Sequence, residues 1–247
     1  MAKQRHLKNA PITEAIIDFR TKLPSIFDAK EFLSLTEKFR ERFPKTQERR
    51  LIKHIFKING GEPPPPITDE GIHGYFFKPE DEKKVVQFRI DGFTFSLLKP
   101  YTKWENFRNE AKDLWKFYVD ITHPEALTRI ALRYINHMDV PLPITNFSEY
   151  LTAPPNVPEN LPGGISGFLS KIVISDPDVN ISANIIQAIE KSTKPNNVTI
   201  ILDIDAYKLS EFYVNNSDIW SIFEKLHESK NKIFFNSITE KTARLFE

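Results

Sequence analysis

The 247-residue chain contains no cysteine, which excludes a disulfide framework, a thiolate metal site and a cysteine nucleophile. It also lacks an excess of charge of either sign, because 34 Lys and Arg residues stand against 33 Asp and Glu residues, for a net charge of +1. Nucleic-acid-binding proteins commonly carry a clear excess of Lys and Arg. Nucleic acid is therefore not favoured as a partner.

Long hydrophobic runs are missing as well. No apolar stretch approaches the ~20 residues that a membrane-spanning helix needs, and the chain opens with the polar residues Met-Ala-Lys-Gln-Arg-His. The sequence thus predicts no membrane partner, no secretory signal and a cytoplasmic location.

Glycine is scarce, with 8 residues, and none of the glycine motifs of nucleotide-binding proteins and serine hydrolases occurs. The six histidines include no pair at the i, i+4 spacing of a helical zinc site. We therefore expect no metal and no cofactor. These absences weigh against common phosphate-binding and hydrolase classes, and leave open an enzyme assembled from distant residues.

Aromatic residues, in contrast, are plentiful, with 20 Phe, and predict a core built on aromatic clusters. Period-two patterns and turn residues predict strands at 11–23, 51–58, 72–77, 84–90, 93–98, 127–140, 167–175, 179–190 and 198–205. Helical spacing predicts helices after Asp28, after a capping box at 102–105, at 147–151, after 217–218, and after a second capping box at 237–240.

These elements predict an α+β fold with a mainly antiparallel sheet and long helices packed on one face. We expect residues 1–247 to form a single compact module. The strand–helix–strands–helix order of residues 1–123 recurs in 124–247, and Trp104-x-x-Phe107 and Trp220-x-x-Phe223 fall at matching places. A tandem duplication would explain this recurrence, although a chance match is an alternative. The four prolines 63–66 predict an extended connector rather than a ligand for a partner domain.

The strand at 128–140 carries the strongest functional pattern. Arg129, Arg133 and His137 share its polar face, and neighbouring strands add Glu14 and Arg89. Aligned arginines suit a carboxylate, a phosphate or an acidic peptide, so we expect this face to bind an anionic ligand or protein partner. The alternative is a solvated face whose charges pair across strands, which is common in antiparallel sheets.

Two competing functions remain open. Asp203 and Asp205 share a strand face, and either these two carboxylates or His137 could serve as the titrating groups of an enzyme acting on a phosphate-containing or nucleic-acid substrate. A solvated position near the end of the strand is the alternative for these two carboxylates. A structural homo-oligomer is the other competitor, with an apolar edge around Tyr75 and Phe77 buried in a symmetric contact.

Three segments resemble a known family. They are Asn9-Ala-Pro-Ile-Thr-Glu-Ala15, the stretch from Gly92 to Phe107 with its Phe-Ser-Leu-Leu-Lys-Pro-Tyr-Thr-Lys-Trp core, and Arg129-Ile-Ala-Leu-Arg-Tyr-Ile-Asn136. They resemble, in order along the whole chain, a sporadically distributed family of uncharacterised prokaryotic proteins of about this length. The resemblance implies a complete single-module protein and no established activity, and its sporadic distribution suits an accessory or defence-related role.

Overall fold

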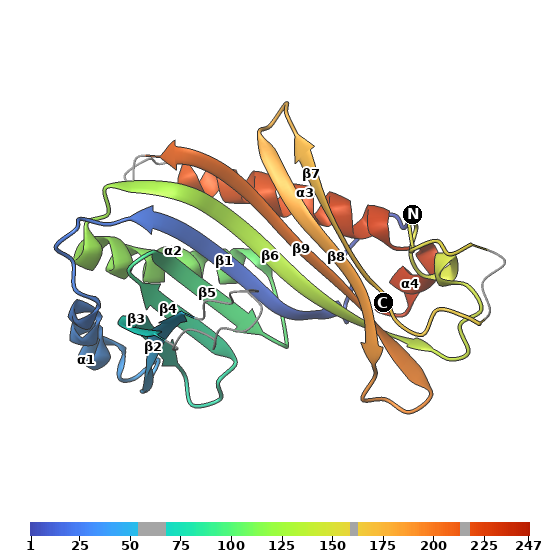
Figure 1. Ribbon diagram of the computed structural model, residues 1–247, viewed down its shortest axis with the longest axis horizontal. Helices are drawn as coiled ribbons and strands as arrows, with labels where there is room; N and C mark the ends of the chain where they lie inside the picture. Colours follow the sequence, from blue (N-terminus) through green and yellow to red (C-terminus); the bar gives the residue numbers. More distant parts are fainter. Residues whose placement is uncertain (54–67, 159–162, 213–217) are drawn as a thin grey trace, which may run out of the picture.

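A nine-stranded antiparallel sheet forms the frame of the molecule (Figure 1). The computed structural model describes residues 1–53, 68–158, 163–212 and 218–247, so the four prolines 63–66 lie outside the described residues. The strands lie in the order β2-β3-β4-β5-β1-β6-β9-β8-β7. Their bounds are β1 (Ile12–Lys22), β2 (Lys45–Lys53), β3 (Thr68–Lys78), β4 (Lys84–Arg89), β5 (Gly92–Leu98), β6 (Ala126–Pro141), β7 (Leu169–Asp176), β8 (Ile181–Lys191) and β9 (Asn197–Phe212).

Two 19-residue helices, α2 (Trp104–Thr122) and α3 (Ile219–Ser237), lie behind the sheet in Figure 1 and cover one of its faces. The shorter helices are η1 (Ala29–Ser34), α1 (Leu35–Phe39), η2 (Phe147–Glu149) and α4 (Glu240–Arg244). The predicted α+β class, the antiparallel sheet and the one-sided helices are therefore confirmed. None of the described helices is long and apolar enough to cross a membrane.

The core fills the space between the two long helices and the sheet. The Phe19 ring of β1 stacks on Trp115 of α2 at 4.1 Å between centroids and meets Phe223 of α3 at 5.1 Å. Along β6, Ile130 and Leu132 are fully buried on the same side of the strand. Because successive strand residues point to opposite faces, this burial leaves the other face of β6 polar, as the sequence pattern predicts.

The strand order places the first strand of each half at the centre of the sheet. β1 pairs with β6, and each is flanked on its other side by the last strand of its own half, β5 or β9. Two related halves would give this arrangement. Whether residues 1–123 and 124–247 arose by duplication stays a prediction.

A two-residue turn at Ile90 and Asp91 joins β4 to β5, with Arg89 opposite Gly92, the first residue of β5. Gly92 has φ +151°, and a Cβ at this position would lie 2.0 Å from the carbonyl oxygen of Phe19. Only glycine therefore allows β5 to approach β1 this closely at the turn.

The predicted capping boxes at 102–105, before α2, and at 237–240, before the short terminal helix, are both wrong. Lys103, not Thr102, is the N-cap of α2, and no side chain caps this helix end. α3 continues through Ser237, and Thr239 caps α4 instead. Each box fails because the helix boundary lies one or two residues from the expected one. The helix expected after Asp28 is present as η1, and Asp28 caps it in a capping box with Glu31.

The predicted apolar edge at Tyr75 and Phe77 is also wrong. These side chains are 2% and 0% exposed within the single chain. Phe39 of α1 covers Phe77 in an edge-to-face contact at 5.4 Å between ring centroids. The first helical segment folds over this end of the sheet, so a symmetric contact is not needed to bury the pair.

Candidate functional site

A shallow groove of about 430 Å³ lies on the polar face of the sheet. We call it the polar groove. The strands β1, β4, β5, β6 and β9 bring together its lining residues, which include Glu14, Asp18, Arg20, Gln87, Thr94, Arg129, Arg133 and Asp205. The expectation that neighbouring strands would extend the polar face of β6 is therefore correct for Glu14 of β1, which lines the groove together with Arg129 and Arg133 of β6.

The arginines of this face are paired with aspartates on adjacent strands. Arg129 donates to both carboxylate oxygens of Asp205, at 2.8 and 2.7 Å, and to Asp18 at 3.2 Å. Arg133 forms a second two-pronged pair with Asp203, at 2.8 and 2.5 Å. Guanidinium–carboxylate pairs of this kind satisfy both partners at once.

Arg89 lies beneath the groove, with a side chain that is only 3% exposed. It donates to Asp18 at 3.1 Å and to Asp91 at 2.8 Å. Burial acts to raise the pKa of Asp91, but the charges of Arg89 and Arg20 outweigh it and hold this pKa at about 2. Asp91 therefore stays ionised and keeps its arginines engaged.

His137 lies on β6, like Arg129 and Arg133, but does not line the polar groove. Its Nδ1 is 3.6 Å from a carboxylate oxygen of Glu190. The expectation that Asp203 and Asp205 lie near the end of a strand is wrong, because β9 continues to Phe212 and places both in its middle. Each carboxylate is occupied by an arginine, and the described residues contain no group of three His, Asp or Glu side chains that could hold a metal ion.

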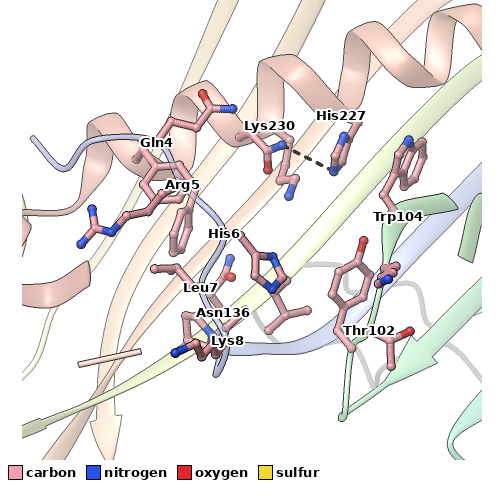
Figure 2. A pocket seen from close by; sticks show the side chains of 18 of the residues that line it. Gln4, Arg5, His6, Leu7, Lys8, Thr102, Trp104, Asn136, His227 and Lys230 are labelled. Carbon is pink, nitrogen blue, oxygen red and sulfur yellow. Dashed lines mark hydrogen bonds between the residues drawn. The ribbon is translucent and has the colours of Figure 1, made fainter. Parts of the chain in front are cut away.

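A larger cavity of about 960 Å³ lies on the opposite, helix-covered side of the sheet. It opens between the N-terminal residues 2–11, the start of α2, the strand β6 and one side of α3 (Figure 2). Its lining includes Arg5, His6, Lys8, Tyr101, Lys103, Trp104, Glu105, Asn136, His227, Lys230 and Phe234. We call this space the strap cavity and residues 2–11 the N-terminal strap.

The strap is fixed at both of its ends. The amide of Ala2 donates to the carbonyl oxygens of Phe235 and Ile238, and the amide of Asn9 donates to that of Phe246 at 3.0 Å. Between them the Arg5 guanidinium pairs with two carboxylates, those of Glu240 and Glu247. This pairing leaves Arg5 little capacity for a further anion. An anion bound in the cavity would therefore have to pair with another cation of the lining.

Lys230 of α3 supplies a buried cation at this cavity. The residue is 6% exposed, and its Nζ lies 3.7 Å from the centroid of the Tyr134 ring. Within the described part of the chain the Nζ has neither a hydrogen bond nor an ion pair, and burial lowers its pKa to about 7. An ammonium removed from water without a carboxylate is costly, so this position favours an anion beside it.

His227, one helical turn before Lys230, forms the wall next to α2. Its ring stacks on Trp104 at 4.5 Å between centroids, as Figure 2 shows. Burial and the charge of Lys230 lower its pKa to about 4, so the ring is neutral at pH 7. The Trp104 indole donates to Glu224 at 2.9 Å, which fixes the start of α2 against α3.

The polar groups of the strap cavity are positioned by the sheet and by α2. Asn136 of β6 is 2% exposed and donates its amide to the carbonyl oxygen of Leu202 at 2.9 Å, which fixes the direction of its side chain. The Tyr101 and Tyr134 hydroxyls lie 2.8 Å apart. The start of α2, at Lys103 and Trp104, also lines the cavity, and a helix N-terminus attracts negative charge.

The strap cavity was not predicted from the sequence, although one signal pointed to it. Phe223, Leu226, Lys230 and Phe234 follow each other at spacings of three and four along α3, and all are buried. A lysine within an apolar stripe is the unusual member of this pattern. Nothing in the sequence of the strap indicated that it would close over this side of α3.

Comparison with known proteins adds no functional assignment. No protein-family model matches the chain, and no curated protein matches it. The function must therefore be argued from the strap cavity and the polar groove themselves.

Proposed function

We propose that the protein binds a small organic anion in the strap cavity. The observation that carries this proposal is Lys230, a cation that is 6% exposed and has no carboxylate partner among the described residues. Its neighbours in the lining strengthen the preference for an anion. Lys8 and Lys103 add positive charge against the single carboxylate of Glu105.

The size and lining of the cavity define the class of ligand. A volume of about 960 Å³ lies within the range of small-molecule sites, which run from about 300 to 1,000 Å³. Trp104, Phe234 and Phe235 provide apolar walls, while Asn136 and the Tyr101 hydroxyl provide a few polar contacts. This combination fits a carboxylate or phosphate group carried on an apolar or planar body.

Binding of 8-anilinonaphthalene-1-sulfonate, an aromatic anion that fluoresces in apolar sites, tests the proposal. We expect one saturable site whose signal benzoate displaces. Lys230→Met should weaken binding about tenfold, equivalent to about 1.4 kcal/mol. Lys116→Met, the same change at a lysine whose side chain is 63% exposed and lines neither site, should leave the affinity unchanged. Equal affinity of the wild type and Lys230→Met would refute the proposal.

The polar groove is the second candidate, and we propose it as a docking face for an anionic ligand or protein partner. Its support is the partial exposure of Arg133, whose side chain is 42% exposed despite its pair with Asp203. Alanine at both Arg129 and Arg133 is the test. If the double variant retains every interaction found with the wild type, the groove has no binding role.

A further inference from the structure

The Lys230 amine combines three properties that are rarely found together in one lysine. It is buried, it lines a cavity large enough for a small molecule, and no carboxylate among the described residues holds it. Figure 2 shows Lys230 and His227 projecting from the same side of α3, with the His6 side chain of the strap beyond them. A carbonyl compound bound at this position would therefore meet an amine that is not already held by a carboxylate of the described residues.

We propose that Lys230 forms a reversible imine with the carbonyl carbon of an aldehyde or 2-oxo acid that carries a carboxylate. This inference rests on the proposed anion binding and adds a covalent step to it. The Nζ lone pair attacks the carbonyl carbon, and one proton moves from nitrogen to the carbonyl oxygen. The second proton on nitrogen then moves to the hydroxyl, the C–O bond breaks to release water, and the C=N bond forms, with no oxidant or reductant required.

The surroundings of Nζ favour this step. An amine attacks only in its neutral form, and desolvation is an established way to make a lysine nucleophilic near neutral pH. Burial lowers the pKa of Lys230 to about 7, so a large share of the amine is neutral at that pH. The Tyr134 ring at 3.7 Å limits where Nζ can lie, which reduces the entropy lost on reaction.

The rest of the lining accounts for the carboxylate of the substrate. Lys103 and the start of α2 lie in the same cavity as Nζ, and no side chain caps this helix. Backbone amides at a helix N-terminus bind carboxylates and phosphates.

Reductive trapping provides the test. The intact protein is incubated with glyoxylate and sodium cyanoborohydride at pH 7, and modified lysines are located by peptide mass spectrometry. We expect Lys230 to be modified at least tenfold faster than Lys116, whose side chain is 63% exposed. Propionaldehyde, which lacks the carboxylate, should modify Lys230 more slowly than glyoxylate does.

Lys230→Arg separates the imine from the binding proposal, because it keeps a cation and removes the amine nucleophile. This variant should still bind 8-anilinonaphthalene-1-sulfonate and should lose the trapped adduct. If glyoxylate modifies Lys230 no faster than Lys116 in the wild type, the imine inference is overturned. The fluorescence titration of wild type and Lys230→Met decides the binding proposal independently, whatever the trapping result.

Discussion

The two faces of the sheet use positive charge in opposite ways. On the polar face, Arg89, Arg129 and Arg133 each pair with aspartates on neighbouring strands. On the helix-covered face, Lys230 is more deeply buried than Arg129 or Arg133, yet has no carboxylate partner in the described part of the chain. The polar face has more charged residues, but they pair with one another. The strap cavity contains Lys230, which has no carboxylate partner among the described residues.

This difference shows that the number of charged side chains does not identify a binding site. Paired arginines can hold strands in register without a ligand, since each guanidinium is satisfied by its neighbour. A buried amine without a partner is satisfied only by water, by losing its proton or by a bound anion. The predictions below separate these two roles.

The largest effect is expected from Asp18→Ala. Asp18 accepts hydrogen bonds from Arg89 and Arg129, and the Arg89 side chain is 3% exposed. Removing one partner of a buried ion pair costs about 3–5 kcal/mol. Because Arg89 keeps its bonds to Asp91 and Thr94, we expect the free energy of unfolding to fall by about 3 kcal/mol. Urea unfolding measures it.

Asp113→Ala is the matched control, because Asp113 pairs with Lys116 on the surface, with both side chains 63% exposed. Exposed pairs contribute about 0–1 kcal/mol. If both variants lose equally little stability, the aspartates of the polar face are not structural.

Lys230→Met should change stability in the opposite direction. Methionine keeps much of the length of the side chain without the charge, so the free energy of unfolding at pH 7 should rise by about 1–3 kcal/mol. If Lys230→Met is instead less stable than the wild type, a partner group compensates the charge of the ammonium in the folded protein.

The gain should also depend on pH. The pKa of Lys230 falls from 10.5 to about 7 on folding, so between these values the unfolded chain holds a proton that the folded chain has released. Wild-type stability therefore rises with pH across this window. Lys230→Met lacks this rise, and its advantage should shrink between pH 7 and 10. Urea unfolding of both proteins at several pH values measures the difference.

His227 should contribute a smaller, acid-side dependence. Its pKa falls from 6.5 to about 4 on folding, through burial and the charge of Lys230. As the pH decreases through this window, the unfolded chain takes up a proton that the folded chain does not, and stability is lost at up to about 1.4 kcal/mol per pH unit. His227→Gln should reduce this loss. Identical pH profiles for wild type and variant would contradict the burial of this ring.

The fold could be predicted largely because its signals are local. Alternation along β6 and helical spacing after Lys103 each reflect which side faces the core. The same alternation correctly placed Arg129 and Arg133 on the polar face. The pairing of these arginines with Asp203 and Asp205 depends on the register between β6 and β9, which a single sequence does not reveal.

The strap cavity was harder to predict because its parts are distant in the chain. Lys230 meets β6, the start of α2 and the strap only after the sheet has assembled and the strap has bonded to the end of α3 and to α4. Helix periodicity places Lys230 on the buried side of α3, but it does not indicate whether a carboxylate lies next to Lys230 in the folded protein.

The protonation of Lys230 tests the central claim most directly. In protein labelled with ¹³C at lysine Cε, the resonance absent from Lys230→Met belongs to this residue. The account predicts that it titrates near pH 7, and that a saturating amount of benzoate moves this titration to higher pH because a bound anion stabilises the ammonium. A midpoint near 10.5 without ligand, as in an exposed lysine, would contradict the account.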